Sequence, residues 1–294
     1  MLIIGAGMSG LLAGQYFRSL NPTIIERQDS LPNNHSALLR FRSDSVSNLT
    51  GINFQEVTVQ KAIYYKRHFC SPSILMNNLY SRKVTGEIHP RSISNLDTCN
   101  RYIAPTDFIQ KVSNGLNARY GEDAKAYLAT SDAGPIISTM PVFALAKMLD
   151  YDLNIELEHK SIWTTTITVP DCDVYQTIYF PDEDFPYYRI SITGDTIIAE
   201  SIKCPSLESG LDESIMECFG IDVEGLEVWM KKQKYGKLIE HSGKEVKDFI
   251  IHATNEHNIY SLGRWGTHRQ ILMDDVVHDL KVIGHLINTN KYGR

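Results

Sequence analysis

The stretch that decides the fold is Leu2-Ile3-Ile4-Gly5-Ala6-Gly7-Met8-Ser9-Gly10, an apolar run followed directly by the pattern G-x-G-x-x-G. The apolar run suits a buried parallel strand. Residues 11–17 have the apolar spacing of a helix, which ends at Asn21-Pro22. Thr23-Ile24-Ile25 then predicts a second strand, which finishes on Glu26. This order of strand, glycine loop, helix, strand and acid predicts a βαβ unit with a dinucleotide site at its loop.

Each glycine of the motif has its own role in such a site. Gly5 permits the tight turn, Gly7 lets the backbone approach a pyrophosphate, and Gly10 lets the helix pack against the sheet. The helix N-terminus adds unpaired N–H groups and a partial positive charge. Glu26, sixteen residues after Gly10, is placed to accept hydrogen bonds from an adenosine ribose and disfavours a 2′-phosphorylated cofactor. The alternative is a glycine turn that only packs a βαβ unit. The candidate cofactor-binding residues of this region are Gly5, Gly7, Ser9, Gly10, Glu26 and Arg27.

Composition limits the possible functions. With 294 residues, 43% hydrophobic and 22% charged, the chain can hold one large domain or two interleaved ones. A net charge of −6 argues against general nucleic-acid binding. We expect no membrane span, because no run of eighteen apolar residues occurs, and no signal peptide, because the first strand starts at the initiator methionine. Five scattered cysteines without C-x-x-C spacing predict reduced thiols in the cytoplasm and no metal site.

Two arginines follow the polar loop predicted over residues 27–35. In an extended conformation Arg40 and Arg42 would share one face. They could form a solvated edge, or one of them could reach a cofactor phosphate or an anionic substrate. Residues 46–104 mix short strand and helix patterns, and we expect an insertion that leaves the nucleotide-binding domain and returns to it.

The remaining pattern predicts a mixed chain. Turns rich in Pro, Asp and Gly divide residues 161–200 into short strands, which is typical of antiparallel hairpins. The other predicted elements are strands over 56–59, 62–65, 136–140 and 258–262, helices over 73–80, 106–120, 142–149, 207–219, 222–232 and 273–287, and a glycine-flanked turn over 263–266.

A second motif lies near the C-terminal end. Gly263-Arg264-Trp265-Gly266, followed by Met273-Asp274, resembles the second flavin fingerprint of the group that contains UDP-galactopyranose mutase, protoporphyrinogen oxidase and the amine oxidases. The glycine loop with Glu26 is similar to that group, and so is Ile136-Ile137-Ser138-Thr139-Met140-Pro141. The three stretches stand at the start, middle and end of the chain, in the order that the group shows.

The resemblance implies that the cofactor is FAD. It also implies that the last helix points its N-terminus at the flavin, with Met273 and Asp274 beside the ribityl chain and the pyrimidine edge. In the mutases, the arginine that matches Arg264 lies near the flavin and the substrate diphosphate. Here Arg264 could instead form a salt bridge with a carboxylate. The resemblance therefore adds Gly263, Arg264, Met273 and Asp274 to the candidate cofactor-binding residues.

Some positions depart from that group. No glycine pair follows Glu26. The tyrosines that bind the sugar nucleotide in the mutases are replaced here by His268 and Ile271. We therefore expect a flavin-dependent oxidoreductase, similar to the amine oxidases, that acts on a small polar or amine-like substrate. A sugar-nucleotide mutase without net redox change and a non-catalytic nucleotide-binding protein are the alternatives.

Two residues near this turn are the candidate catalytic groups. Arg264 could anchor an anionic or strongly polar substrate. His268 follows the flavin-facing turn and could act as an acid or a base, or it could be structural. Tyr187 and Arg189 alternate along a predicted strand, so they would share a face and could line the cavity, although core packing is equally possible.

The predicted fold is α/β: a Rossmann-type FAD-binding domain with a parallel sheet, interleaved with an antiparallel β-sheet substrate domain that carries helices. The FAD-binding domain would comprise residues 1–45, 130–160 and 245–294. The substrate or cap domain would comprise residues 46–129 and 161–244.

Overall fold

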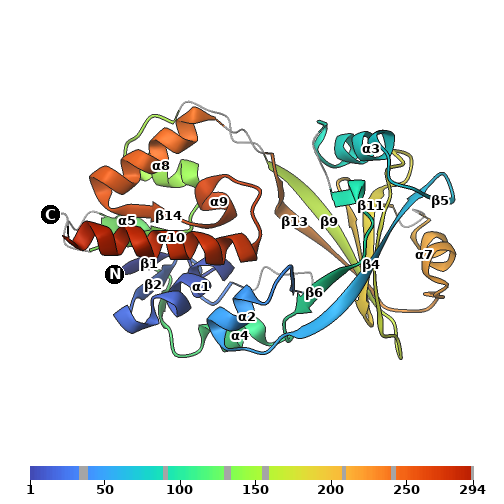
Figure 1. Ribbon diagram of the computed structural model, residues 1–294, viewed down its shortest axis with the longest axis horizontal. Helices are drawn as coiled ribbons and strands as arrows, with labels where there is room; N and C mark the ends of the chain where they lie inside the picture. The colour runs from blue at the N-terminus through green and yellow to red at the C-terminus, as the bar shows by residue number, and fades with distance from the viewer. Residues whose placement is uncertain are drawn as a thin grey trace.

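The structure is a computed structural model that describes residues 1–32, 39–88, 92–128, 134–153, 159–206, 210–239 and 243–292. It has two lobes, each built around one β-sheet (Figure 1). The first sheet is parallel and has the strand order β14-β8-β1-β2-β7. Its strands are β1 (Leu2–Ile4), β2 (Thr23–Glu26), β7 (Asn117–Tyr120), β8 (Ile136–Ser138) and β14 (Ile259–Ser261).

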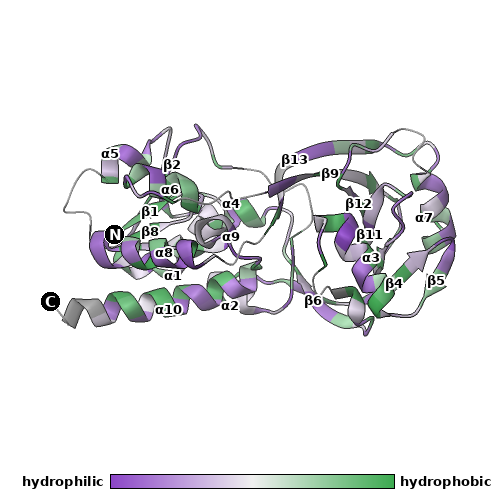
Figure 2. Ribbon diagram, turned by 90° about the horizontal axis from the view of Figure 1, so that it is seen from above, coloured by the Kyte–Doolittle hydropathy of each residue, from purple (hydrophilic) through white to green (hydrophobic). Residues whose placement is uncertain are grey.

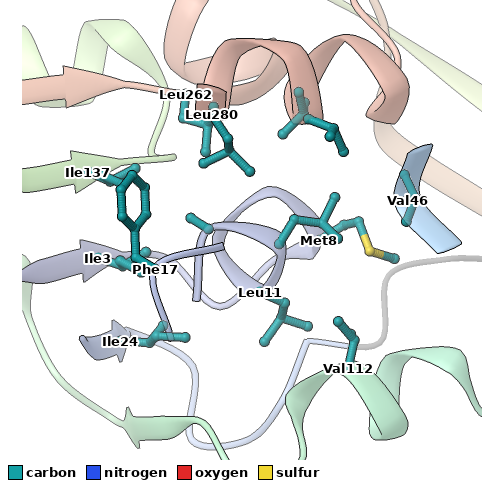
Figure 3. Packing of buried hydrophobic residues seen from close by; sticks show 14 of the residues in the cluster. Ile3, Met8, Leu11, Phe17, Ile24, Val46, Val112, Ile137, Leu262 and Leu280 are labelled. Atoms are coloured by element: carbon teal, nitrogen blue, oxygen red, sulfur yellow. The ribbon is translucent and has the colours of Figure 1, made fainter. Parts of the chain in front are cut away.

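Helices cover both faces of the first sheet, which explains why its central strands are apolar throughout. Ile3 and Ile24 pack on one side, and Ile4 and Ile25 pack on the other. Figure 3 shows part of the first of these cores. The helices on that side are α1 (Met8–Tyr16), α2 (Ser45–Thr50), α4 (Phe108–Ser113) and α10 (Met273–Tyr292). Those on the opposite side are α5 (Ala124–Leu128), α6 (Val142–Met148) and α8 (Lys244–His257).

The second sheet is mostly antiparallel and has the order β13-β9-β12-β11-β10-β4-β6-β3, with β5 paired to β4. Only the pair β4 and β10 is parallel within the described residues. Helix α7 (Leu211–Phe219) packs on one face and α3 (Ile74–Thr85) on the other. The strands are β3 (Arg40–Phe41), β4 (Gln55–Tyr65), β5 (His68–Cys70), β6 (Cys99–Ile103), β9 (His159–Thr168), β10 (Val174–Tyr179), β11 (Tyr187–Gly194), β12 (Thr196–Ser201) and β13 (Val228–Leu238). The predicted α/β fold with two interleaved sheets is confirmed.

One segment lies in a different lobe from the one predicted. The single helix predicted over 106–120 is instead α4, a turn at Asn114-Gly115, and β7. Gly115 has a φ of +73°, a left-handed conformation that a helix cannot continue through. Because β7 pairs with β2, residues 108–128 belong to the first sheet and its helices, not to the cap region 46–129.

The helix predicted over 222–232 is also wrong. Gly225 has a φ of +77°, and the chain then enters β13, which pairs with β9 along its length. The helical spacing of Val223, Leu226 and Met230 therefore arises by coincidence. Val223 is buried against α7 and its core, whereas Met230 is 40% exposed on the strand.

Candidate flavin-binding site

The three glycines of the first motif meet different surroundings. Gly5 has a φ of +99°, and a Cβ there would lie 2.3 Å from Thr139 Oγ1, on the segment after β8. A Cβ on Gly10 would lie 1.8 Å from the carbonyl oxygen of Gly5, so α1 packs directly on the loop. A Cβ on Gly7 would have no atom within 4 Å in the described part of the chain. The loop therefore needs Gly5 and Gly10 for its own packing, whereas Gly7 faces open space.

The open space lies at the N-terminus of α1. Gly7 is the N-cap residue, no side chain in the described part of the chain caps the helix, and no acidic residue occurs in its first turn. The first N–H groups of a helix have no partner within the helix, and they carry a partial positive charge. An anionic group in front of Gly7 would therefore find donors that no described side chain uses. A dinucleotide pyrophosphate fits this arrangement.

Glu26 lies across the same loop at the end of β2. Its Oε2 accepts a hydrogen bond from Ala6 N at 2.8 Å, and its Oε1 accepts one from Gln28 N at 3.0 Å. Each carboxylate oxygen keeps a second acceptor site, which a ribose hydroxyl could use. On the neighbouring strand, burial and the negative charge of Glu26 raise the pKa of Tyr120. Arg27 points its side chain into solvent.

The two sequence motifs meet in the structure. β14 leads into α9 (Gly263–Thr267), a short helix where a turn was predicted. Gly263 has a φ of +82°, and a Cβ there would lie 2.5 Å from Ser9 Oγ on α1. The glycine thus lets the second motif approach the first turn of α1. Ser9 and Gly263 are therefore neighbours in the structure, although they lie near opposite ends of the chain.

Arg264 is largely buried and is held by a backbone carbonyl. Its Nε and Nη2 donate hydrogen bonds to Ile271 O at 3.3 and 3.2 Å. Burial lowers the pKa of its guanidinium. Among the described residues, no carboxylate lies within 4.0 Å of the Arg264 guanidinium. The alternative that Arg264 forms a salt bridge therefore finds no partner in the described part of the chain. The other side of the guanidinium keeps donors that could bind a polar ligand.

His268 lies in a different environment from the glycine loop. Its side chain is buried, and its Nε2 is 3.1 Å from Ile239 O, just after β13. The residue has a φ of +49° and ends α9. It lines a groove of about 550 Å³ between α8 and α10, and none of the described glycine-loop residues lines this groove. These contacts favour a structural position for His268.

The beginning of α10 is tied to the segment that follows β3. Asp274 accepts hydrogen bonds from Arg42 N at 3.2 Å, Ser43 N at 2.9 Å and Ser43 Oγ at 2.6 Å. Asp275 accepts one from Leu272 N at 2.7 Å. Met273 packs against the core beside α1. Because two acids occupy its first turn, α10 offers less free positive charge than the resemblance implies.

Arg40 crosses from β3 to the middle of the second sheet. Its guanidinium donates to Thr177 Oγ1 at 3.2 Å on β10 and to Thr193 Oγ1 at 3.4 Å on β11. Burial, together with the positive charge of Arg189, lowers its pKa to about 10. The sequence left two explanations for Arg40, a solvated edge of the sheet or contact with an anion. Because Arg40 is largely buried, the solvated edge is excluded for this residue. The segment from Arg40 to Ser43 links this part of the second sheet to α10.

A buried ion pair lies next to Arg40. Arg189 on β11 donates to Glu200 on β12, and the side chains are 33% and 10% exposed. Burial alone would raise the pKa of Glu200, but the charge of Arg189, assisted by Lys237, lowers it below its usual value. A β-bulge between Tyr187 and Arg189 puts the two residues on opposite faces, so their predicted pairing is wrong. Tyr187 is instead buried in the core beneath α7.

Solved structures with a similar fold cover nearly the whole of this chain. The chain is similar to reduced UDP-galactopyranose mutase, with a TM-score of 0.66, 13% identity, and coverage of 98% of this chain and 93% of that one. An oxidoreductase from Methanosarcina mazei gives a TM-score of 0.57 at 10% identity, with 97% and 99% coverage. A protein from Pyrococcus furiosus gives 0.54 at 12% identity, with 98% and 97% coverage.

These similarities show the fold and no particular activity. The chain shares its overall fold, over nearly its full length, with UDP-galactopyranose mutase and with that oxidoreductase. No family model matches the sequence. No curated protein matches it either. Within the described residues, no helix is long and apolar enough to cross a membrane.

Proposed function

We propose that this protein is a flavin-dependent oxidoreductase that binds FAD at the glycine loop and acts on a small polar or amine-like substrate in the cytoplasm. The observation that carries the proposal is the space at Gly7 that no described atom fills, in front of an α1 N-terminus that no described side chain caps. Glu26 is fixed across that space by two backbone N–H groups. Together these groups supply donors for a pyrophosphate and acceptors for a ribose.

We propose that the second motif adds further cofactor contacts. The proposal is supported by the approach of Gly263 to Ser9 on α1, and by Met273, which begins α10 and packs against the core that contains α1. The proposed contacts include Asp274, the next residue of α10. When bound, the flavin would supply a two-electron acceptor for substrate oxidation. The role of the chain is to hold the cofactor and to place a substrate beside it.

The second sheet favours a substrate that carries a negative or strongly polar group. Arg40, Arg189 and Lys237 gather around one buried carboxylate, Glu200. This face therefore carries an excess of positive charge, which favours the polar substrate over the amine-like one, since a cationic amine would be repelled. The same excess would also suit a redox-neutral rearrangement of a sugar nucleotide, which is the second candidate function.

The identity of the cofactor and the type of chemistry can be tested on the purified protein. We expect visible flavin absorbance and the release of intact FAD on denaturation, because the chain has no recognisable covalent attachment motif. Release of NAD, or of no nucleotide, would contradict the proposal. Candidate substrates are then added without oxygen. Bleaching of the flavin in proportion to substrate indicates an oxidoreductase, and product formation without net bleaching indicates the mutase.

The proposed role of Arg264 is to anchor the substrate. One side of its guanidinium is oriented by Ile271 O, and this leaves the other donors in a fixed direction. Arg264→Lys and Arg264→Ala are therefore expected to raise KM more than they lower kcat, because the contact is made in both the bound state and the transition state. FAD content is measured alongside, with Arg82→Lys on the exposed face of α3 as the control. Unchanged kcat/KM with full FAD would make Arg264 purely structural.

A further inference from the structure

Within the described residues, the outer edge of β13 has no partner strand. β13 is the last strand of the second sheet and pairs only with β9 among the described residues. Figure 2 shows it along the outer margin of that lobe. Its register with β9 is regular from Val228 to Gln233 and shifts after Gln233. An open edge presents unpaired N–H and C=O groups to which another strand can bind.

Apolar side chains accompany this open edge. Val228 is 51% exposed, Trp229 is 64% exposed and Met230 is 40% exposed. Because successive residues of a strand point to opposite faces, apolar surface is exposed on both faces of the sheet margin. Exposed tryptophan and methionine are enriched in protein interfaces relative to the rest of a protein surface. The edge therefore has both the backbone groups and the apolar area of a contact surface.

The sequence around Trp229 is complementary to itself in the antiparallel direction. If a two-fold axis passes beside Trp229, Val228 lies opposite the partner subunit's Met230, and Glu227 lies opposite the partner subunit's Lys231. Opposite charges then flank an apolar centre on both sides. Glu227 and Lys231 are both exposed and can form this pair. Each pair occurs twice, because a two-fold contact uses the same surface on both copies.

We propose that two copies of this chain associate through β13, in an antiparallel pairing centred on Trp229. The pairing joins the second sheets of the two copies into one continuous sheet. Backbone hydrogen bonds give the geometry, and the charge pairs fix the register. A second copy is the occupant that the charges favour, because the sequence from Glu227, just before β13, to Lys231 on β13 matches itself in the antiparallel direction.

Charge exchange tests the register directly. Glu227→Lys alone, or Lys231→Glu alone, places like charges opposite each other at two points, and each variant should weaken the dimer by about tenfold or more. The double variant Glu227→Lys/Lys231→Glu restores opposite charges and should restore the dimer. A mixture of the two single variants should form a heterodimer, since each copy then faces the opposite charge.

Sedimentation velocity over a range of protein concentrations measures all of these species. Glu256→Lys, an equal charge change at an exposed position of α8, is the control and should leave association unchanged. A wild-type protein that stays monomeric at high concentration would overturn the proposal. A dimer that is indifferent to both single exchanges, or association into open chains of copies, would overturn it as well. The test of association does not depend on FAD binding, so it stands apart from the proposed function.

Discussion

Gly7→Val is expected to give a folded protein that no longer retains FAD. The φ of Gly7 is −68° and its ψ is 175°, which valine adopts without strain. A Cβ at this position meets no described atom within 4 Å, so the protein itself has room for it. The branched side chain would instead fill the space in front of the α1 N-terminus, where the pyrophosphate is proposed to bind. We therefore expect flavin content to fall to background.

The measurement is flavin absorbance per protein after purification, together with thermal unfolding of the cofactor-free form. Gly10→Val is the informative contrast, because a Cβ there would lie 1.8 Å from Gly5 O and should prevent the loop from forming. Loss of flavin with unchanged unfolding in Gly7→Val separates a binding defect from a folding defect. Full flavin content in Gly7→Val would show that the nucleotide does not bind at this loop.

Glu26→Ala provides a graded companion to this experiment. Removing the carboxylate should weaken cofactor binding by about 1–3 kcal/mol, the scale of a hydrogen bond to a charged group. The same change also removes the acceptor of Ala6 N, so part of the effect could come from the loop itself. The unfolding of the cofactor-free variant measures that part separately.

The first βαβ unit of the parallel sheet was predictable because its signals are local, whereas β7 of the same sheet was predicted as part of a helix. An apolar run, three glycines at fixed spacing and an acid at the end of the next strand determine β1, α1 and β2 without knowledge of distant residues. The C-terminal motif was predictable for the same reason. Its approach to Ser9 was not, since only the closed fold shows that Gly263 faces α1.

The second sheet was harder to predict because its contacts are distant in sequence. Residues 222–232, which include the start of β13, show apolar spacing that suits a helix, and only the pairing of β13 with β9 makes its part a strand. The bulge in β11 changes which face Arg189 occupies, and no single residue in the sequence signals it. Glu200 did not stand out in the sequence either. Its importance comes from burial beside Arg189, which residue type alone does not predict.

Glu200→Ala is expected to lower the free energy of unfolding by about 3–5 kcal/mol. The reason is that the change leaves Arg189, which is only 33% exposed, without its carboxylate partner. Glu213→Ala is the matched control, because Glu213 pairs with Arg67 at the surface, where the two side chains are 61% and 64% exposed. An exposed pair of this kind contributes about 0–1 kcal/mol. Replacing both Arg189 and Glu200 by leucine should cost much less than Glu200→Ala, because neither charge is then left unpaired.

The contribution of Glu200 should also depend on pH, with a defined sign. Its folded-state pKa lies below the usual value for a glutamate, because the charge of Arg189 outweighs the effect of burial. The stabilisation is therefore complete above the unfolded-state pKa of about 4.3 and is lost as the pH falls through the lower folded-state pKa. Denaturant unfolding of the wild type and of Glu200→Gln at neutral pH and in acid measures this difference. It should be large at neutral pH and shrink in acid. A difference that is small at neutral pH, or that grows in acid, would mean that the pair does not stabilise this sheet.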